Sequence, residues 1–412
     1  MADEINASTK SYKLKAGFAW YSTTNFVYYL TIALKGYLTV FLQSLGYSAT
    51  DIGILNALNS GVGIVAQPFW GALSDKLRSV KKVLIICIVF GSALYALIPL
   101  TSNINFGPIN IAFIFIPAVF FFTNPTMTLF DNFMVRSAAA NRIDYGRIRA
   151  FGALSYAMMG VALGFVLPYT GISITFYMSA LIIIPPLVLI GLSQNVDENV
   201  GKKRLTFKEM QIGQIAKSYY LLAFILFTVF LRIPNVCAHT FLPYLVSAIE
   251  ADPAQIGFIT GFRAFIEIPA MFLLKPLSKK MPLHYLIILS GLLYGVGNVL
   301  NSYASNVTEL ILYSVIYGFA NGLMLTVSVR LVYLLSPEHL KATTQTLMGA
   351  MGAIAGIIGS LIGGRLVDTM GVKPFYAVIG IITAIASIIY AASYIFGEKV
   401  LKISKPSSET EG

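Results

Sequence analysis

Charge is what this sequence has least of. Only 11% of its 412 residues are Asp, Glu, Lys or Arg, whereas 57% are hydrophobic. A soluble globular protein carries roughly 25% charged residues. A chain this apolar could not cover a water-facing surface, so the composition excludes an ordinary soluble protein and indicates that the solvent is lipid.

Acidic residues are scarcer than basic ones: 18 Asp and Glu against 29 Lys and Arg give a net charge of +11. In a soluble protein this balance would indicate binding to nucleic acid. Here the basic residues fall in short loops between apolar runs, where they orient a chain in a membrane. We therefore expect the lipid bilayer as surroundings and no nucleic-acid partner.

Cysteine and histidine are also rare, with two and three residues. Cys87 and Cys237 lie inside apolar runs without the spacing of metal ligands, and we expect both to be small buried side chains. The sequence shows no His/Cys/acid cluster, no Ser–His–Asp order and no phosphate-binding loop. These absences predict no metal, no cofactor and no enzyme activity.

Long apolar runs are present instead. A helix that spans a bilayer needs about 20 mostly apolar residues. Twelve such stretches predict an all-α membrane protein with twelve transmembrane helices. They lie at approximately 16–43, 50–73, 82–100, 108–135, 146–168, 172–193, 217–246, 254–277, 284–303, 309–335, 343–367 and 373–396.

The loops between these stretches alternate in charge, because every second one lacks Lys and Arg while the others and both chain ends are basic. Basic loops stay in the cytoplasm. The pattern predicts a multi-pass protein of the cell (plasma) membrane with both termini cytoplasmic. The loops without basic residues are 44–49, 101–107, 169–171, 247–253 and 304–308.

The two halves of the chain resemble each other. AspIleGly at Asp51 recurs as GlnIleGly at Gln255, and LeuSer at Leu73 recurs at Leu277, in both cases 204 residues later. Duplicated halves about a central cavity are a transporter architecture. We expect two pseudo-symmetric six-helix bundles. The expected parts are the bundles 1–193 and 217–398, a cytoplasmic linker at 194–216 and a cytoplasmic tail at 399–412.

The loop after the second predicted span reads GlyAlaLeuSerAspLysLeuArgSerValLysLys, starting at Gly71. This resembles the loop motif of major facilitator transporters, Gly-x-x-x-Asp-(Arg/Lys)-x-Gly followed by basic residues, except that Arg78 stands at the second Gly. The resemblance implies alternating access by rocking bundles, with Gly71, Asp75 and Lys76 as a conformational latch. The alternative is a solvated loop whose charges only orient the chain.

A second stretch begins AspAsnPheMetValArgSer at Asp131, continues as GlyArgIleArgAlaPheGly and reaches Tyr156. It resembles the lactose permease and oligosaccharide–proton symporter family, and Arg149 follows Asp131 by 18 residues as in that family. The resemblance implies that Asp131 and Arg149 bind sugar hydroxyls and that Tyr156 stacks on the sugar ring. The alternative is a structural ion pair near the cytoplasmic ends of two helices.

The second half departs from that family. The family couples transport to protons through a His and a Glu in the tenth span, where this chain has Tyr317 and Ala320. Glu267 is the one acid near mid-membrane in this half, so we expect it to carry the proton. Arg263, one turn before it, and Arg232 would assist. The alternative is a static cluster of these three residues that only holds the fold.

The predicted function is secondary active transport of a sugar or oligosaccharide in symport with protons. We expect a small solute and protons as partners and a functional monomer. Lys35 lies inside the first span, where it could pair with Asp131 or contact the solute. Because Lys35, Arg232 and Arg263 face few acids, an alternative stays open: an organic anion, a nucleoside or a drug, moved by symport or antiport.

Overall fold

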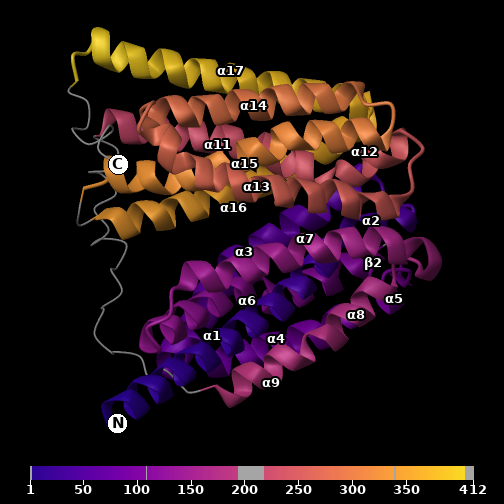
Figure 1. Cartoon of the computed structure of the whole chain (residues 1–412). Coiled ribbons are helices and arrows are strands. Elements are labelled where there is room, and N and C mark those ends of the chain that lie inside the picture. The colour runs from indigo at the N-terminus through magenta and orange to yellow at the C-terminus, as the bar shows by residue number, and fades with distance from the viewer. Residues whose placement is uncertain (1, 108, 194–217, 338–339, 404–412) are drawn as a thin grey trace. The chain divides into compact units, whose positions relative to one another are not determined.

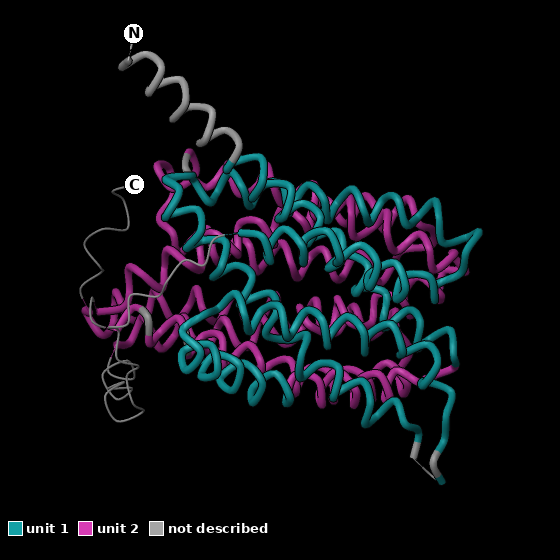
Figure 2. The backbone as a smooth tube through the Cα atoms, turned by 90° about the horizontal axis from the view of Figure 1, so that it is seen from below, with its two compact units in different colours: residues 1–45, 61–202 teal, residues 46–60, 203–412 magenta. Residues whose placement is uncertain are grey.

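The chain folds almost entirely into helices in a computed structural model (Figure 1), which describes residues 2–107, 109–193, 218–337 and 340–403. These residues belong to two compact units (Figure 2), Met1–Leu45 with Gly61–Lys202 and Gly46–Ser60 with Lys203–Gly412. The predicted linker 194–216 and most of the predicted tail 399–412 lie outside the described residues. The division into two six-helix bundles stays a prediction.

The first unit consists of helices and one very short hairpin. Its two-residue strands pair Asn105 with Asn110; the first lies in the loop predicted at 101–107 and the second at the start of the span predicted at 108–135. The elements are α1 (Ala2–Lys35), α2 (Leu38–Ser44), α4 (Val80–Ala96), α5 (Ile98–Thr101), β1 (Asn105–Phe106), β2 (Ile109–Asn110), α6 (Ala112–Ala140), α7 (Tyr145–Thr170), α8 (Ile174–Ile182) and α9 (Ile184–Leu192).

The second unit is also helical, and α3 (Ala49–Lys76) begins in it and ends in the first unit. Helices α13 and α15 pack along each other, as do α14 and α17 (Figure 1). The further elements are α11 (Tyr219–Thr240), α12 (Leu242–Ala248), η1 (Pro253–Gln255), α13 (Ile256–Ser278), α14 (Leu283–Tyr303), α15 (Val307–Leu335), α16 (Lys341–Met370) and α17 (Val372–Lys399).

Eleven helices in the described part of the chain are long and apolar enough to cross a membrane. The predicted span 82–100 is not among them, because α4 has 17 residues and α5 continues it only after Leu97. The predicted span 172–193 is divided at Ile183, just before Pro185 and Pro186, whose missing N–H groups end a helix ladder. The all-α membrane class is confirmed.

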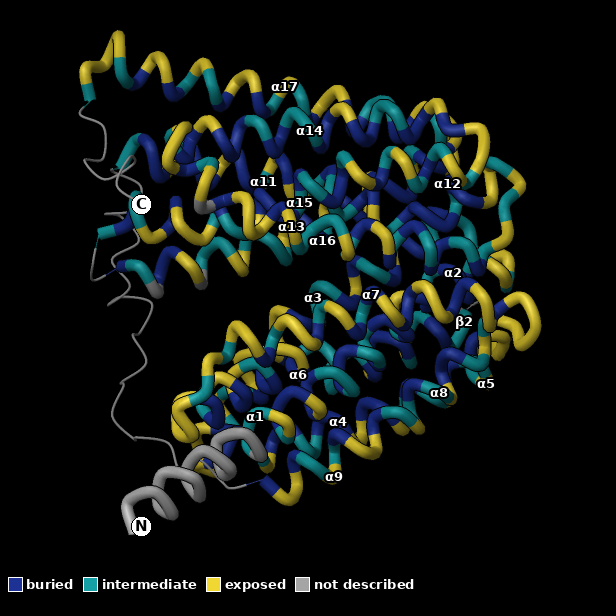
Figure 3. Tube along the Cα trace, viewed as in Figure 1, coloured by how far each residue is buried: buried dark blue, intermediate teal, exposed yellow. Residues whose placement is uncertain are grey.

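The surface fits a lipid solvent. Exposed positions recur along the helices, α17 among them (Figure 3). Large apolar residues are among them, such as Ile388 and Ile389 of α17, which are 59% and 62% exposed. Backbone groups are satisfied within helices, which lipid requires. Cys87 and Cys237 are free and buried, as predicted.

Glycines bring together the helices that carry the functional residues. A Cβ on Gly152 of α7 would lie 2.3 Å from Oδ1 of Asn25 and 2.6 Å from the ring of Tyr29. Cβ atoms on Gly318 and Gly322 of α15 would lie 2.5 and 2.6 Å from backbone oxygens of α13. Real Cβ atoms do not come this close, so only glycine allows α7 to pack on α1 and α15 on α13 at these points.

Candidate solute and proton sites

The first candidate site lies where α1, α6 and α7 meet. Asp131 of α6 accepts hydrogen bonds on Oδ1 from the hydroxyls of Tyr29 (3.1 Å) and Tyr145 (3.0 Å). The guanidinium carbon of Arg149 on α7 lies 4.1 Å from the centre of the Tyr29 ring, which is a cation–π distance. The fold therefore brings the two predicted sugar ligands together, with Tyr29 connecting them. Asp144 fixes the start of α7 by accepting from the amide of Gly146 (2.8 Å).

The two other predicted solute ligands lie further along their helices. Tyr156 is half-buried and lies seven residues, about two turns, beyond Arg149 on α7. Lys35 ends α1, and its Nζ lies 5.6 Å from the ring centre of Tyr95, whose hydroxyl donates to the carbonyl of Lys35 (3.2 Å). No ion pair between Lys35 and Asp131 occurs in the described part of the chain, so the structure places Lys35 against Tyr95 instead.

The second candidate site lies in the second unit, around Glu267 of α13. The side-chain amide of Asn321 on α15 donates to Oε1 of Glu267 at 2.7 Å. The oxygen of the same amide accepts from the hydroxyl of Tyr294 on α14. Glu267 is thus held by an amide, and the chain of hydrogen bonds runs across three helices.

Arg263 does not pair with Glu267, one turn away, in this structure. Its side chain is 3% exposed, and its guanidinium carbon lies 3.9 Å from the ring centre of Tyr317. Among the described residues, Nε and Nη1 of Arg263 have no acceptor. Helix packing thus gives Glu267 an amide as hydrogen-bond partner and Arg263 an aromatic face. The assisting roles of Arg263 and Arg232, and the alternative of a static cluster, both stay predictions. Tyr317 in turn accepts from Nδ2 of Asn235 (2.9 Å).

A pocket of about 270 Å³ opens beside this cluster, between α11, α14, α15 and α16. Arg232 lines it, as do Tyr294 and Asn321, so the amide that holds Glu267 belongs to the pocket wall. Arg232 is the only charged residue among its lining residues. These are Thr228, Leu231, Arg232, Asn235, Tyr294, Asn321, Met324, Leu325, Ser328, Val329, Val332, Gln345, Met348 and Gly349.

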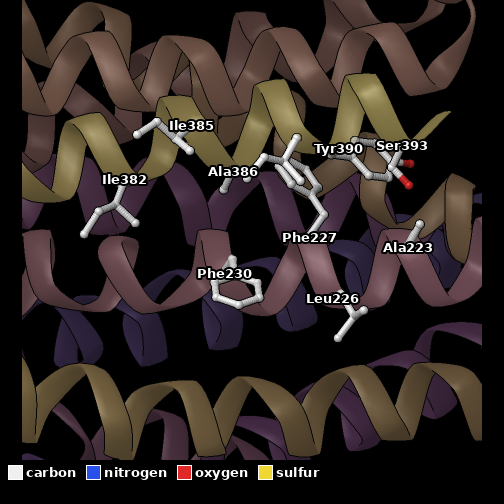
Figure 4. Close-up of a pocket in the computed structure, with 10 residues that line it drawn as sticks. Ala223, Leu226, Phe227, Phe230, Ile382, Ile385, Ala386, Tyr390 and Ser393 are labelled. Carbon is white, nitrogen blue, oxygen red and sulfur yellow. The ribbon is translucent and has the colours of Figure 1, made fainter. Parts of the chain in front are cut away.

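A larger groove of about 380 Å³, between α11 and α17, has a different character (Figure 4). Phe227, Phe230, Ile382 and Ile385 are among the apolar side chains that line it, and no charged residue does. A polar solute needs a few converging polar groups. The groove therefore lacks the polar groups of a site for a polar solute, whereas the polar pocket of the second unit and, separately, the cluster around Asp131 in the first unit have them.

The predicted latch residues Gly71, Asp75 and Lys76 form the last turns of α3. Arg78, which replaces the family's glycine, adopts the left-handed conformation that glycine would allow, with φ 48°. Its amide donates to the carbonyl of Asp75 (3.1 Å). The departure in sequence thus leaves the tight turn intact, and the latch itself stays a prediction.

Sequence reasoning missed Asp368, near the end of α16. Its carboxylate accepts from the first two amides of α3, Ala49 (3.1 Å) and Thr50 (2.7 Å). A negative charge at a helix N-terminus is favourable. The hydroxyl of Tyr244 also donates to the carbonyl of Tyr47 (2.7 Å), so two contacts hold this start of α3 within the second unit. The sequence did contain a signal for this contact, because Asp368 is an acidic residue in the predicted outer turn between the spans 343–367 and 373–396.

Apolar helices long enough to cross a membrane, with polar clusters between them, define a multi-pass helical membrane protein. A family model, the MFS_1 like family, matches residues 18–378. The chain therefore belongs to this family of the major facilitator superfamily, and the sequence resemblance to that superfamily's sugar permeases is confirmed.

Individual relatives agree with this assignment. The uncharacterized transporter YwbF of Bacillus subtilis (strain 168) is 26% identical over 349 residues, 82% of each chain. The lactose permease of Klebsiella oxytoca is 22% identical over 352 residues, which are 81% of this chain and 83% of that protein. The solved structure of the nucleoside transporter NupG shares the fold with TM-score 0.76 at 14% identity, covering 92% of this chain and 99% of that one.

Proposed function

We propose that this transporter moves a sugar or small oligosaccharide across the plasma membrane in symport with protons, by alternating access. The observation that carries the proposal is the arrangement of Asp131, Tyr29 and Arg149 at one point of the first unit. The similarity to a lactose permease supports the same solute class.

The chemistry of this cluster suits vicinal hydroxyl groups. The carboxylate of Asp131 accepts hydrogen bonds, and the guanidinium of Arg149 offers several donors in a fixed plane. Tyr29 and Tyr145 already donate hydroxyl groups to Asp131, as a sugar would. Tyr156, two turns further along α7, would offer an aromatic face to the sugar ring.

We propose Glu267 as the proton carrier. While Glu267 is ionised, the amide of Asn321 donates to its carboxylate, and the charge of Arg263, one helical turn away, favours the same ionised form. When the bond to this amide is lost, the carboxyl takes up a proton. Loss and return of the bond in the two access states would bind and release the proton, with Gly71, Asp75 and Lys76 latching one of them.

A second candidate, an organic anion or a nucleoside, is favoured by Arg232. This cation is the only charged residue that lines the polar pocket of the second unit. A solute with a negative or strongly accepting group would satisfy it. Uptake of labelled sugars, compared with uptake of a nucleoside and an organic anion, distinguishes the two solute classes.

The test is uptake of labelled lactose, maltose and raffinose, with uridine and an aromatic carboxylate for comparison, into vesicles with and without an imposed pH gradient. We expect sugar uptake that depends on the gradient. It should be lost in Asp131→Asn, because the amide has one acceptor oxygen where the carboxylate has two. Asp144→Asn, which changes the N-cap of α7, is the matched control. Sugar uptake unaffected by D131N, or uptake of uridine or the carboxylate alone, would contradict the sugar assignment.

A further inference from the structure

Asn321 occupies a position that links two parts of the second unit. Its amide nitrogen donates to Glu267, and its oxygen accepts from Tyr294. Both Asn321 and Tyr294 also line the polar pocket, whereas Glu267 does not. Within the described part of the chain, the hydrogen-bond donor to the Glu267 carboxylate is thus a residue that a solute in the pocket would touch.

The backbone around this link is closely packed. Gly318 and Gly322 bring α15 so near α13 that a Cβ on either glycine would lie 2.5 or 2.6 Å from a backbone oxygen of α13. The helices cannot separate slightly to follow a side chain without losing this contact. A change at Asn321 is therefore a rotation of its amide, while Glu267 stays in place.

Other charged and titratable groups surround Glu267. On its own helix the neighbour is Arg263, whose guanidinium lies on the ring of Tyr317. These groups belong to four helices, and none of them donates a hydrogen bond to Glu267 among the described residues. They are Arg263 of α13, Tyr317 of α15, Tyr294 of α14, and Arg232 and His239 of α11.

We propose that Asn321 couples the solute to the proton: a solute in the polar pocket draws the Tyr294 hydroxyl and the Asn321 amide to itself, and Glu267, deprived of its donor, takes up a proton. The inference rests on the proposed function in taking a sugar as the solute and Glu267 as the proton carrier, and it extends that function by letting the solute also contact this pocket and by naming the residue that makes proton binding depend on solute. Asn321 acts as a positioning residue for Glu267.

The solute and Glu267 compete for the side-chain amide of Asn321. Hydrogen bonds to charged groups are stronger than those between neutral groups, so the amide of Asn321 stabilises an ionised Glu267 more than a protonated one. The hydroxyl of Tyr294 fixes which way the amide points. A solute oxygen that takes this hydroxyl frees the amide to turn into the pocket. A buried carboxylate without a hydrogen-bond donor has a higher free energy when it is charged than when it is protonated, so Glu267 then takes up a proton.

The first measurement counts protons per bound sugar in weakly buffered, purified protein, using the lactose, maltose and raffinose of the uptake panel. We expect sugar to cause proton uptake in the parent protein but only background uptake in Asn321→Leu, which keeps the side-chain size. Asn235→Leu is the matched control, because Asn235 lines the same pocket but bonds to Tyr317. It should weaken sugar binding and keep the number of protons per bound sugar.

The second measurement needs no sugar. The infrared band of the protonated Glu267 carboxyl, identified by its loss in Glu267→Gln, should persist to a pH about one to two units higher in Asn321→Leu than in the parent. Tyr294→Phe should move the band in the same direction and serves as a second variant. Asn235→Leu should leave it in place.

The two measurements distinguish the failures. An unchanged infrared titration and unchanged protons per sugar in Asn321→Leu would overturn the role of Asn321, as would an equal shift in Asn235→Leu. If none of the three sugars binds but the infrared band shifts as expected, the sugar assignment fails and the link between Asn321 and Glu267 stands.

Discussion

The hydroxyl of Tyr29 donates to the carboxylate of Asp131 at 3.1 Å, and the guanidinium of Arg149 lies 4.1 Å from the centre of the same tyrosine ring. The two residues singled out by the sequence motif are therefore joined by a third from another helix. Tyr29 donates to the carboxylate of Asp131, and its ring packs against the guanidinium of Arg149. Loss of Tyr29 should therefore disturb the geometry of both side chains.

Tyr29→Phe removes the hydrogen bond to Asp131 and keeps the ring under Arg149. A hydrogen bond to a charged group contributes about 1.5–3 kcal/mol, so sugar uptake measured as kcat/KM should fall roughly 10- to 100-fold. The neighbouring Tyr28, stacked on Phe130 at 3.8 Å, is the control. Tyr28→Phe should transport nearly as well as the parent, and equal losses in the two variants would show that the Tyr29 hydroxyl has no special role.

Gly152→Ala should lower the melting temperature of the purified protein. The new Cβ would lie 2.3 Å from Oδ1 of Asn25 and 2.6 Å from the Tyr29 ring, and overpacking of this kind costs about 1–3 kcal/mol. Gly61→Ala is the matched control, because no atom lies within 4 Å of a Cβ there. The close packing of α1 on α7 is refuted if both variants melt at the same temperature.

Asp368→Asn should loosen the start of α3. The charge acts on two helix N-terminal amides, a contact worth about 0.3–1 kcal/mol, so alkylation of a cysteine placed at Thr50 should become up to about fivefold faster. The background would carry Cys87→Ser and Cys237→Ser. Asp51 accepts from the hydroxyl and the amide of Ser48 in the same turn, at 2.7 and 3.1 Å, and Asp51→Asn is the control. Faster alkylation in D51N alone would contradict the role of Asp368.

Glu267→Gln should separate transport from its driving force. The variant cannot release a proton but can still bond to Asn321, so exchange of labelled for unlabelled sugar should continue while accumulation driven by a pH gradient is lost. Glu309→Gln provides the comparison, because Glu309 lies half-buried in the first turn of α15 and bonds locally to Ser305 and Asn306. Gradient-driven accumulation that survives E267Q would rule out Glu267 as the carrier.

The sequence alone determined the membrane class, the positions of most spanning helices and the candidate residues Asp131, Arg149 and Glu267. Apolar run length and charge are properties of local sequence, and lipid leaves a chain few other ways to satisfy its backbone. Helix breaks such as the one at Ile183 follow from proline, although their consequence for span 172–193 was not predicted.

Only the tertiary structure determined which residues these side chains contact. The sequence predicted that Arg263, one turn away, assists Glu267, but it did not predict Asn321, whose amide reaches Glu267 because α15 approaches α13 closely at Gly318 and Gly322. Tyr29 and Asp368 likewise gained their roles from residues at least 102 positions away in the chain. Local sequence fixes which face of a helix a side chain occupies, whereas the packing of helices distant in sequence selects what that side chain meets.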